Sequence, residues 1–445
     1  MNHFIISDLH LNMGKQEDGE LHPLEDYDSD DAFSRLLEII QQRGGQLIIN
    51  GDWVDFLQLE PFWEAGRYFS QTGIPLGWTS EDAQKKLETV FRTQKRHFSD
   101  LAAFLKKPGS KLTVMQGNHD PDWFFPSVDQ SGQPPLQKML RQQLGGPPED
   151  RVEFRAASLR VGSVHVEHGH QQCEPMNAFQ NHPNIFHADR NSPIFGDPRF
   201  ELLWGSRFVL GFFNNLEMTH PFADNLKTMT RALLLGIKNK WVNAGTAADV
   251  LKFFWGSGIP WRDIPQLLGP EEVDVIRMLH EIDNPEVRDF FFDRLHSDPG
   301  FERELSASIK STPKEELSRF RNTDRLDIGK KEIQVSEPGT LGIFRDSREI
   351  RQARMLLEQP GVTSVIFGHT HQEIDGHDPA APLGGYFNTG TWTPRFDLRK
   401  EENQAMLRQG KMPEEILSDR TRFELRLMYA EIDDQAGTVE LKEVS

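Results

Sequence analysis

The chain has 445 residues, of which 37% are hydrophobic and 27% charged, so its length allows two or three average domains with a sizeable core. Its formal net charge of -18 counts against broad nucleic-acid binding, because affinity for a duplex depends on neutralising phosphates with Lys and Arg. We therefore expect no nucleic-acid partner. A small phosphate ester remains compatible, since bound divalent cations invert the local field of an acidic protein.

The N-terminus and the single cysteine bear on the compartment. Met1 runs directly into a predicted strand, which leaves no room for the charged and apolar regions of a removable signal peptide. The one cysteine, Cys173, cannot form an internal disulfide and fits a reducing compartment. No window of 18 uninterrupted apolar residues occurs, so no membrane-spanning helix is predicted. We expect a cytoplasmic protein and leave peripheral attachment to a membrane open.

Five short apolar runs predict buried strands. In chain order they are Phe4-Ile5-Ile6-Ser7, Leu47-Ile48-Ile49-Asn50, Leu112-Thr113-Val114-Met115, Val164-His165-Val166-Glu167 and Val362 to Phe367. Between the early strands, residues 31–42 have apolar side chains on one helical face, and residues 79–107 repeat this pattern behind a Thr79-x-x-Asp82 capping box. The resulting βαβαβ order predicts a layered α/β core. Alternation and a turn over residues 423–444 predict a closing hairpin.

Each of these five strands is followed by a polar motif. The motifs are Asp8-Leu9-His10, Gly51-Asp52-Trp53-Val54-Asp55, Gly117-Asn118-His119-Asp120, His168-Gly169-His170 and Gly368-His369-Thr370-His371. Functional residues of open α/β sheets collect at the carboxyl ends of the strands, so we expect these side chains to meet. Carboxylate, amide and imidazole ligands suit manganese, iron or zinc. Two such ions, about 3.5 to 4 Å apart, suit in-line displacement at a phosphate ester.

Taken together, the ordered motifs resemble the calcineurin-like metallophosphoesterase superfamily. The nearest similarity is to the UDP-2,3-diacylglucosamine hydrolase-like group, through residues 6–11, 368–371 and 386–392. The resemblance implies a four-layer αββα sandwich of two mixed sheets flanked by helices. Its core would comprise residues 1–175 and 345–445, and residues 176–344 would form a large, mainly helical insertion.

The resemblance also implies a ligand map for two divalent ions, with manganese the first choice. It assigns Asp8, His10, Asp52 and His371 to one ion and Asp52, Asn118, His168 and His369 to the other. Asp52 would bridge the two. The implied reaction is hydrolysis of a phosphate ester or pyrophosphate bond by a metal-bridging hydroxide, with His119 as general acid and Asp120 as the partner that orients it.

The chain departs from the motifs of three related groups, which narrows the part of the superfamily that it resembles. Phosphoprotein phosphatases continue the second motif with Arg-Gly and end the third with Glu, whereas Phe56 and Asp120 stand here. Purple acid phosphatases place Tyr where this chain has Asp55, and the hydrolase-like group usually carries Arg where it has His119. Asp55 itself and His170 have no ligand slot left, so we expect both to hydrogen-bond to groups around the ligands.

Other polar clusters are expected to be structural or to contact substrate. This applies to His182, His187 and Asp189, which lie in an irregular Asn- and Pro-rich stretch. The acidic run at residues 26–31 lacks the Gly and the closing Glu of a calcium loop, so we predict a solvated loop that ends in a helix N-cap at Ser29 or Asp30.

The insertion is the least defined part of the sequence. Residues 199–261 are rich in large apolar side chains, which fits the core of a helical subdomain, a lid over an apolar or lipid-linked substrate, or an oligomer or peripheral membrane contact. If it is a lid, three arginines are candidates for binding a second phosphate: Arg190, Arg199 and Arg207. Residues 270–325 show an ordinary helical surface pattern.

A different class of function is also compatible with these motifs. Some members of the superfamily keep the fold as a catalytically silent scaffold or protein-binding module after losing ligands. Here every ligand position and the general acid are filled, which favours the enzyme.

Overall fold

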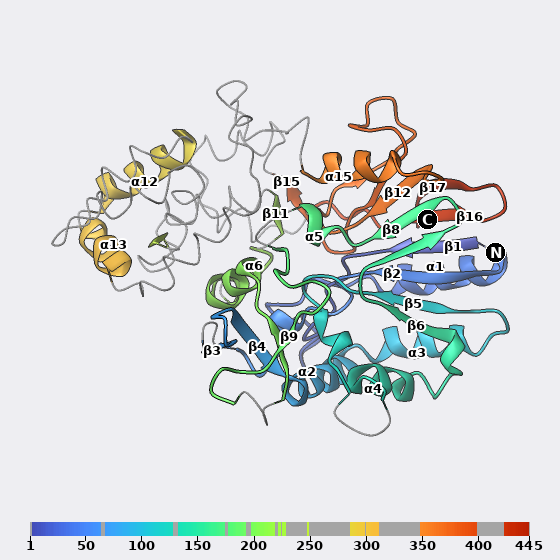
Figure 1. Cartoon of the computed structure of the whole chain (residues 1–445), viewed down its shortest axis with the longest axis horizontal. Coiled ribbons are helices and arrows are strands. Elements are labelled where there is room, and N and C mark those ends of the chain that lie inside the picture. Colours follow the sequence, from blue (N-terminus) through green and yellow to red (C-terminus); the bar gives the residue numbers. More distant parts are fainter. Residues whose placement is uncertain are drawn as a thin grey trace. The chain divides into compact units, whose positions relative to one another are not determined.

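A computed structural model describes residues 2–63, 67–127, 132–173, 177–192, 197–218, 221–223, 225–227, 247–248, 285–298, 300–310, 348–397 and 422–444 (Figure 1). The chain divides into two compact units. The first comprises Met1–Phe222, Ile343–Arg395 and Thr421–Ser445, and the second comprises Ala223–Gly342 and Phe396–Arg420. The first unit thus continues to Phe222, past the core boundary predicted at residue 175.

The first unit contains a six-stranded sheet with the order β17-β16-β1-β2-β5-β6. Its strands are β1 (Asn2–Ile6), β2 (Gly45–Asn50), β5 (Leu112–Met115), β6 (Val152–Arg155), β16 (Met428–Asp433) and β17 (Thr438–Glu443). Strands β1, β2, β5 and β6 are parallel, and the β16-β17 hairpin adds antiparallel to β1. The closing hairpin is confirmed, although its first strand begins at Met428 rather than near residue 423.

A second, five-stranded sheet has the order β13-β14-β12-β8-β7. Its strands are β7 (Ser158–Val161), β8 (Val164–Glu167), β12 (Ser364–Phe367), β13 (Glu373–Ile374) and β14 (Tyr386–Thr389). The two sheets contribute to one hydrophobic cluster, in which Ile5 and Ile48 of the first sheet join Val166, Ile366 and Phe387 of the second. All five predicted strands are present, and their carboxyl ends precede the five motifs.

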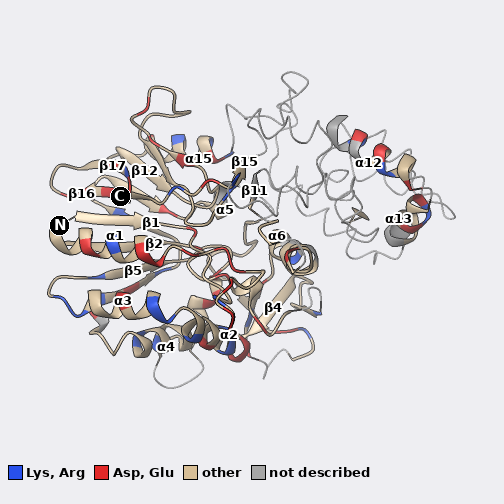
Figure 2. Ribbon diagram, turned by 180° about the vertical axis from the view of Figure 1, so that it is seen from behind, with Lys and Arg blue, Asp and Glu red and all other residues tan. Residues whose placement is uncertain are grey.

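Helices cover the sheets. On the side of the first sheet lie α1 (Asp30–Arg43), α2 (Ser80–Thr93), α3 (Lys95–Leu105) and α4 (Pro135–Gln143), and α15 (Arg348–Leu357) packs on the second (Figure 1). Acidic and basic residues both occur along α1 and α2, as expected for solvated helix faces (Figure 2). The fold is thus mixed α/β.

The helix predicted at residues 79–107 is two helices. It begins with the predicted capping box of Thr79 and Asp82, but α2 ends at Thr93 and α3 starts at Lys95. Gln94 lies between them with φ -98° and ψ 39°, outside the helical region. Its side chain donates to the buried carboxyl of Glu25 at 2.8 Å, so a polar tertiary contact is made where the helix breaks.

A small sheet, β3-β4-β10-β9, joins the start of the predicted insertion to the first unit. It consists of β3 (Tyr68–Phe69), β4 (Pro75–Thr79), β9 (Phe186–His187) and β10 (Arg199–Glu201). Phe200 packs edge-on against Trp78 with ring centroids 4.9 Å apart. Buried apolar residues of this segment include Leu202, Leu203 and Phe213. For these residues the apolar pattern therefore reflects core packing, and residues 228–246 and 249–261 lie outside the described residues.

Short elements connect these parts. They are the 3₁₀ turns η1 (Phe56–Gln58), η2 (Pro121–Phe124) and η3 (Glu149–Arg151), the short helices α5 (His170–Cys173), α6 (Trp204–Phe208) and α7 (Asn214–Glu217), and the π-helical turn η5 (Val209–Phe213). The Asn214 side chain donates to the carbonyl of Leu57 at 2.9 Å, and Gln58 donates to Glu217 at 2.6 Å. These two hydrogen bonds connect α7, which lies within the predicted insertion, to the η1 turn that follows the second motif.

The second unit is described only in part. It contains β11 (Leu226–Lys227) paired in parallel with β15 (Phe396–Asp397), and the helices α12 (Pro285–Ser297) and α13 (Phe301–Lys310). The helical pattern predicted at residues 270–325 holds for these two helices. The remaining residues of that stretch lie outside the described ones. Among the described helices, none is long and apolar enough to cross a membrane.

Candidate metal centre

The backbone at the motifs is strained. Six described residues other than glycine have a positive φ, and five of them are predicted ligands. The six are Asp8 (55°), His10 (52°), Asp52 (50°), Phe222 (70°), His369 (66°) and His371 (56°). Such conformations cost about 1–3 kcal/mol each and persist only where the surroundings enforce them. Their concentration at the ends of β1, β2 and β12 makes this edge of the two sheets the candidate functional site.

Three motif glycines make room for ligand side chains. A Cβ atom at Gly51 would lie 2.5 Å from Nδ1 of His168. At Gly368 it would lie 2.6 Å from Oδ2 of Asp8, and at Gly117 it would collide with Oδ1 of Asp52. A larger residue at these positions would collide with the side chains of predicted ligands. Glycine is therefore required here for space as well as for backbone freedom.

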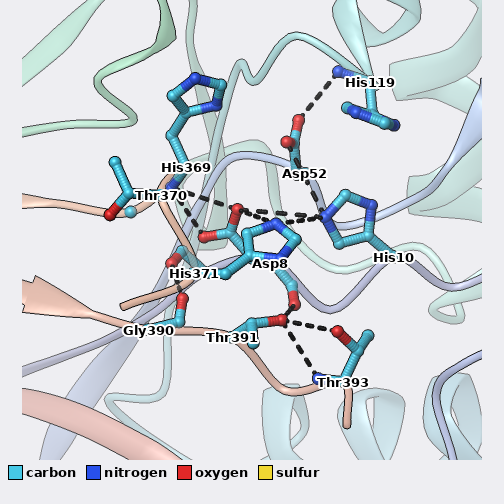
Figure 3. A network of polar contacts seen from close by, with 12 residues as sticks. Asp8, His10, Asp52, His119, His369, Thr370, His371, Gly390, Thr391 and Thr393 are labelled. Atoms are coloured by element: carbon cyan, nitrogen blue, oxygen red, sulfur yellow. Dashed lines mark hydrogen bonds and ion pairs between the residues drawn. The ribbon is translucent and has the colours of Figure 1, made fainter. Parts of the chain in front are cut away.

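Asp8, His10 and His371 form the first group of potential ligands (Figure 3). Nε2 of His371 lies 3.2 Å from Oδ1 of Asp8 and 3.2 Å from Nε2 of His10. The other ring nitrogen of His10, Nδ1, lies 3.0 Å from Oδ2 of Asp55 and donates its hydrogen there, since a carboxylate can only accept. Nε2 of His10 then carries a lone pair, which faces Asp8 and His371. A metal ligand requires such a lone pair.

Asp52, His168 and His369 form the second group. Nδ1 of His168 donates to the carbonyl of Asn50 at 2.7 Å, so Nε2 is the nitrogen that faces Oδ2 of Asp52, 3.0 Å away. Both residues are buried, and in the metal-free protein a proton on Nε2 balances the charge of Asp52. A metal ion can take the place of that proton, so the donor set fits a metal ion.

Asp52 links the two groups. Its Oδ2 lies 4.0 Å from Nε2 of His10 as well as 3.0 Å from Nε2 of His168, so this carboxylate stands between the groups. Its other oxygen accepts the backbone N–H of His119 at 2.9 Å (Figure 3). The structure thus brings together six of the seven predicted ligands. The seventh, Asn118, has a buried amide oxygen with no hydrogen-bond partner among the described residues, which suits a metal ligand.

The electrostatics of the centre are dominated by buried carboxylates. Burial alone would lower the pKa of His168, but the charges of Asp52 and Asp8 outweigh it and raise that pKa to about 9. Burial opposes ionisation of Asp8 and Asp52, yet the surrounding histidines hold the pKa of both carboxyls well below the usual range. The pocket therefore favours positive charge between its acids, which a divalent cation supplies.

The predicted partner of His119 needs correction. Nδ1 of His119 lies 2.8 Å from Oδ2 of Asp55, not against Asp120. The carboxylate of Asp120 is fully buried and instead accepts the backbone N–H groups of Gly117 at 2.7 Å and Trp53 at 2.9 Å. The side chain of Asp120 therefore points away from His119. Its hydrogen bonds connect the third motif, at Gly117, to the second, at Trp53. Asp55 takes the orienting role.

Asp55 and His170 behave differently from each other, although both were expected to support the ligands. Asp55 contacts the rings of His10 and His119, as expected. His170 is buried with its ring centroid 5.4 Å from that of His168, but neither of its ring nitrogens has a hydrogen-bond partner among the described residues. The expectation of hydrogen bonding by His170 is therefore wrong in this structure.

Asn388 is a supporting residue without an assigned role in the sequence reading. Its side chain donates to the carbonyl of Gly368 at 2.8 Å and to the hydroxyl of Thr370 at 3.1 Å, which holds the fifth motif from behind. Ser7 adds a hydroxyl contact of 2.7 Å to Thr389. The available signal was the polar run Asn388-Thr389-Gly390-Thr391 directly after the apolar pair Tyr386-Phe387.

Comparisons of the chain with models of protein families, with curated proteins and with solved structures gave no match. The geometry of the site therefore carries the functional argument.

The remaining candidates are engaged in the packing of the first unit. His187 pairs with Glu201 at 2.8 Å, and Asp189 accepts the backbone N–H of Asn191 at 3.2 Å. The guanidinium of Arg199 lies 3.7 Å from the ring centroid of Tyr68 and donates to the Gly77 carbonyl, so it serves the small sheet. The acidic run precedes α1 with Ser29 at the N-cap position, as predicted, but Ser29 makes no side-chain cap hydrogen bond. The predicted solvated loop is confirmed only in part, because Asp28 and Asp31 are exposed whereas Asp26 and Ser29 are buried.

Proposed function

We propose that this chain is a dinuclear metal-dependent phosphoesterase built on a four-layer metallophosphoesterase sandwich. The observation that carries the proposal is the buried convergence of two ligand groups, Asp8, His10 and His371 on one side and Asp52, His168 and His369 on the other. The shared hydrophobic cluster of the two sheets and the helices beside them support the layered arrangement.

The ligand chemistry selects the ions. One would be held by the first group together with Asp52, and the other by Asn118 and the second group, with Asp52 common to both. Imidazole, carboxylate and amide donors without a thiolate suit manganese, iron or zinc, and manganese is our first choice. Two such ions would supply Lewis-acid stabilisation of phosphoryl oxygens and an activated water near neutral pH.

His119 supplies the proton that the leaving group needs. It is partly exposed, with 19% of its side chain accessible, whereas Asp55 beside it is buried. Neighbouring histidines keep the pKa of Asp55 well below the usual range despite its burial, so the carboxylate stays ionised and holds the Nδ1 hydrogen of His119. This fixes the ring, and Nε2 of His119 is the atom from which a proton passes to the leaving oxygen.

The substrate class is a phosphate ester or a pyrophosphate. The net charge of -18 disfavours a polyanionic nucleic acid, and a small substrate suits a site whose cations lie among buried acids. The substrate could also have an apolar or lipid-linked part. Residues 228–246 and 249–261 would then be the ones to bind it, because buried residues between 199 and 213 pack into the first unit.

The catalytically silent scaffold is the competing function. To discriminate the two, we would measure turnover of p-nitrophenyl phosphate and bis-p-nitrophenyl phosphate by chelator-stripped protein with added manganese, iron or zinc. We expect hydrolysis that depends on the added metal. Folded protein that is inactive with all three metals would instead favour the scaffold.

A further inference from the structure

Lys86 is a buried cation that the proposed reaction does not use. It lies on α2 and is fully buried, which is rare for a lysine. Its Nζ donates to the carbonyl of Phe56 at 2.7 Å and lies 3.5 Å from the ring centroid of Trp78. An ammonium group has three donors, so one hydrogen bond and one aromatic face replace only part of its hydration.

The carbonyl that Lys86 holds belongs to a peptide at the edge of the metal centre. Phe56 follows Asp55 directly, and its backbone N–H donates to the carbonyl of His119 at 3.3 Å. Asp55 caps the same turn, η1, by accepting the N–H of Leu57 at 3.0 Å. Lys86 therefore anchors, from a helix outside the site, a turn in which the N–H of Leu57 is bonded to Asp55 and the N–H of Phe56 is bonded to His119.

Charged groups surround Lys86 on several elements. Asp82 lies on its own helix, Asp55 precedes η1, and Asp122 lies on η2 and accepts the indole N–H of Trp78 at 2.5 Å. Burial lowers the pKa of Lys86 to about 7 against the pull of these carboxylates.

We propose that Lys86 is a positioning residue for the Asp55–His119 pair, which it aligns by holding the Phe56 carbonyl. This proposal rests on the proposed role of His119 as general acid. It differs from a purely structural role in one respect. Loss of Lys86 must impair protonation of the leaving group more than the other steps, because Lys86 reaches the site through η1, which is bonded to Asp55 and His119.

The kinetic test compares an alkyl phosphate, which needs an acid, with p-nitrophenyl phosphate, which does not. For Lys86→Met, and for Lys86→Met/Asp122→Asn in which both buried charges are removed together, we expect kcat on the alkyl phosphate to fall by about 10- to 100-fold. On p-nitrophenyl phosphate the fall should stay within about threefold. Val90→Ala, which truncates another buried side chain of α2, controls for loss of helix packing and should not change the ratio.

A double-mutant cycle sharpens the test. In a His119→Asn background, Lys86→Met should add no further loss on the alkyl phosphate, since its effect passes through His119. Equal losses on both substrates, unchanged rates, or additive losses in the cycle would each overturn the proposal.

A readout without metal or turnover separates this proposal from the proposed function. In the metal-free protein, the Nδ1 proton of His119 should give a downfield NMR signal that His119→Asn removes. We expect Lys86→Met/Asp122→Asn to shift or abolish that signal, and an unchanged signal would overturn the positioning role. If the wild type hydrolyses neither substrate with any metal, the proposed function fails, and the NMR result alone decides the role of Lys86.

Discussion

Nδ1 of His119 lies 2.8 Å from Oδ2 of Asp55. The same oxygen lies 3.0 Å from Nδ1 of His10, a predicted metal ligand. One buried carboxylate therefore sets the ring tautomer of both the proposed acid and a ligand, since each histidine must keep its hydrogen on Nδ1. This arrangement couples the metal site to the site of proton transfer.

His119→Asn tests the acid directly. The substitution should leave the metal ligands in place but slow hydrolysis of esters with poor leaving groups by about 10²- to 10⁴-fold. The effect on activated aryl phosphates should be much smaller, because their leaving groups depart without a proton. Rates with a series of leaving groups check this, and equal losses across the series would remove His119 from the acid role.

Asp55→Asn and Asp120→Asn form a matched pair. The first replaces the acceptor that fixes His119, so it should lower hydrolysis of poor leaving groups by about 10²- to 10⁴-fold. The second weakens the acceptor for the backbone N–H groups of Gly117 and Trp53, so it should reduce the free energy of unfolding by about 1–3 kcal/mol without selectivity for the leaving group. A selective kinetic loss in Asp120→Asn, absent from Asp55→Asn, would restore the partner predicted from sequence.

Gly117→Ala should damage metal binding. Its Cβ would collide with the carboxylate of Asp52, which must then move away from the other ligands. We expect the affinity for manganese to fall by about 10-fold or more, as measured by competition with a chelating dye. Gly384→Ala is the control, because its nearest neighbour is 4.0 Å away. Equal manganese affinity in the two variants would argue against the tight packing at Gly117.

Acid destabilisation should be partly attributable to His97. Nε2 of its buried ring accepts the indole N–H of Trp53 at 3.1 Å, and burial lowers its pKa to about 3. The folded state thus opposes protonation, so stability is complete above the unfolded pKa of about 6.5 and falls as pH decreases toward 3. The slope from this group is about 1 kcal/mol per pH unit. Urea unfolding of metal-free protein should show a shallower pH dependence for His97→Gln, and identical dependence would refute the assignment.

Much of the first unit could be predicted from local sequence. The apolar runs before Asp8, Asp52 and Asn118 are the parallel strands β1, β2 and β5, because short β-branched stretches with polar ends have few other solutions. The helix break at Gln94 could not be predicted. It depends on a contact with Glu25, which lies 69 residues away in the sequence.

The meeting of the motif residues could be predicted, because the motifs follow strands whose carboxyl ends lie at one edge. The ligand map came from the resemblance to a superfamily, and the carboxylate that contacts His119 was predicted wrongly. The choice between Asp55 and Asp120 instead depends on which way a side chain turns. Asp120 turns toward the N–H groups of Gly117 and Trp53, while Asp55 reaches His119 across the space between two motifs. Adjacency in sequence misled here because consecutive side chains point in different directions.

Apolar composition does not indicate which partner buries a segment. Phe200 and Phe213 look like a lid or a separate core, yet the first is buried beside Trp78 and the second lies in the turn next to η1. The pairing of β10 with β4 and the hydrogen bond from Asn214 to the Leu57 carbonyl place this segment in the first unit.

The number of manganese ions bound per chain, in wild type and in Asp52→Ala, tests the dinuclear centre most directly. Equilibrium dialysis followed by elemental analysis should find two ions in the wild type and fewer than two in Asp52→Ala, because this carboxylate lies 3.0 Å from His168 and 4.0 Å from His10 and would serve both ions. Wild-type protein that binds no manganese, iron or zinc, or an Asp52→Ala variant that still binds two ions, would contradict the proposed centre.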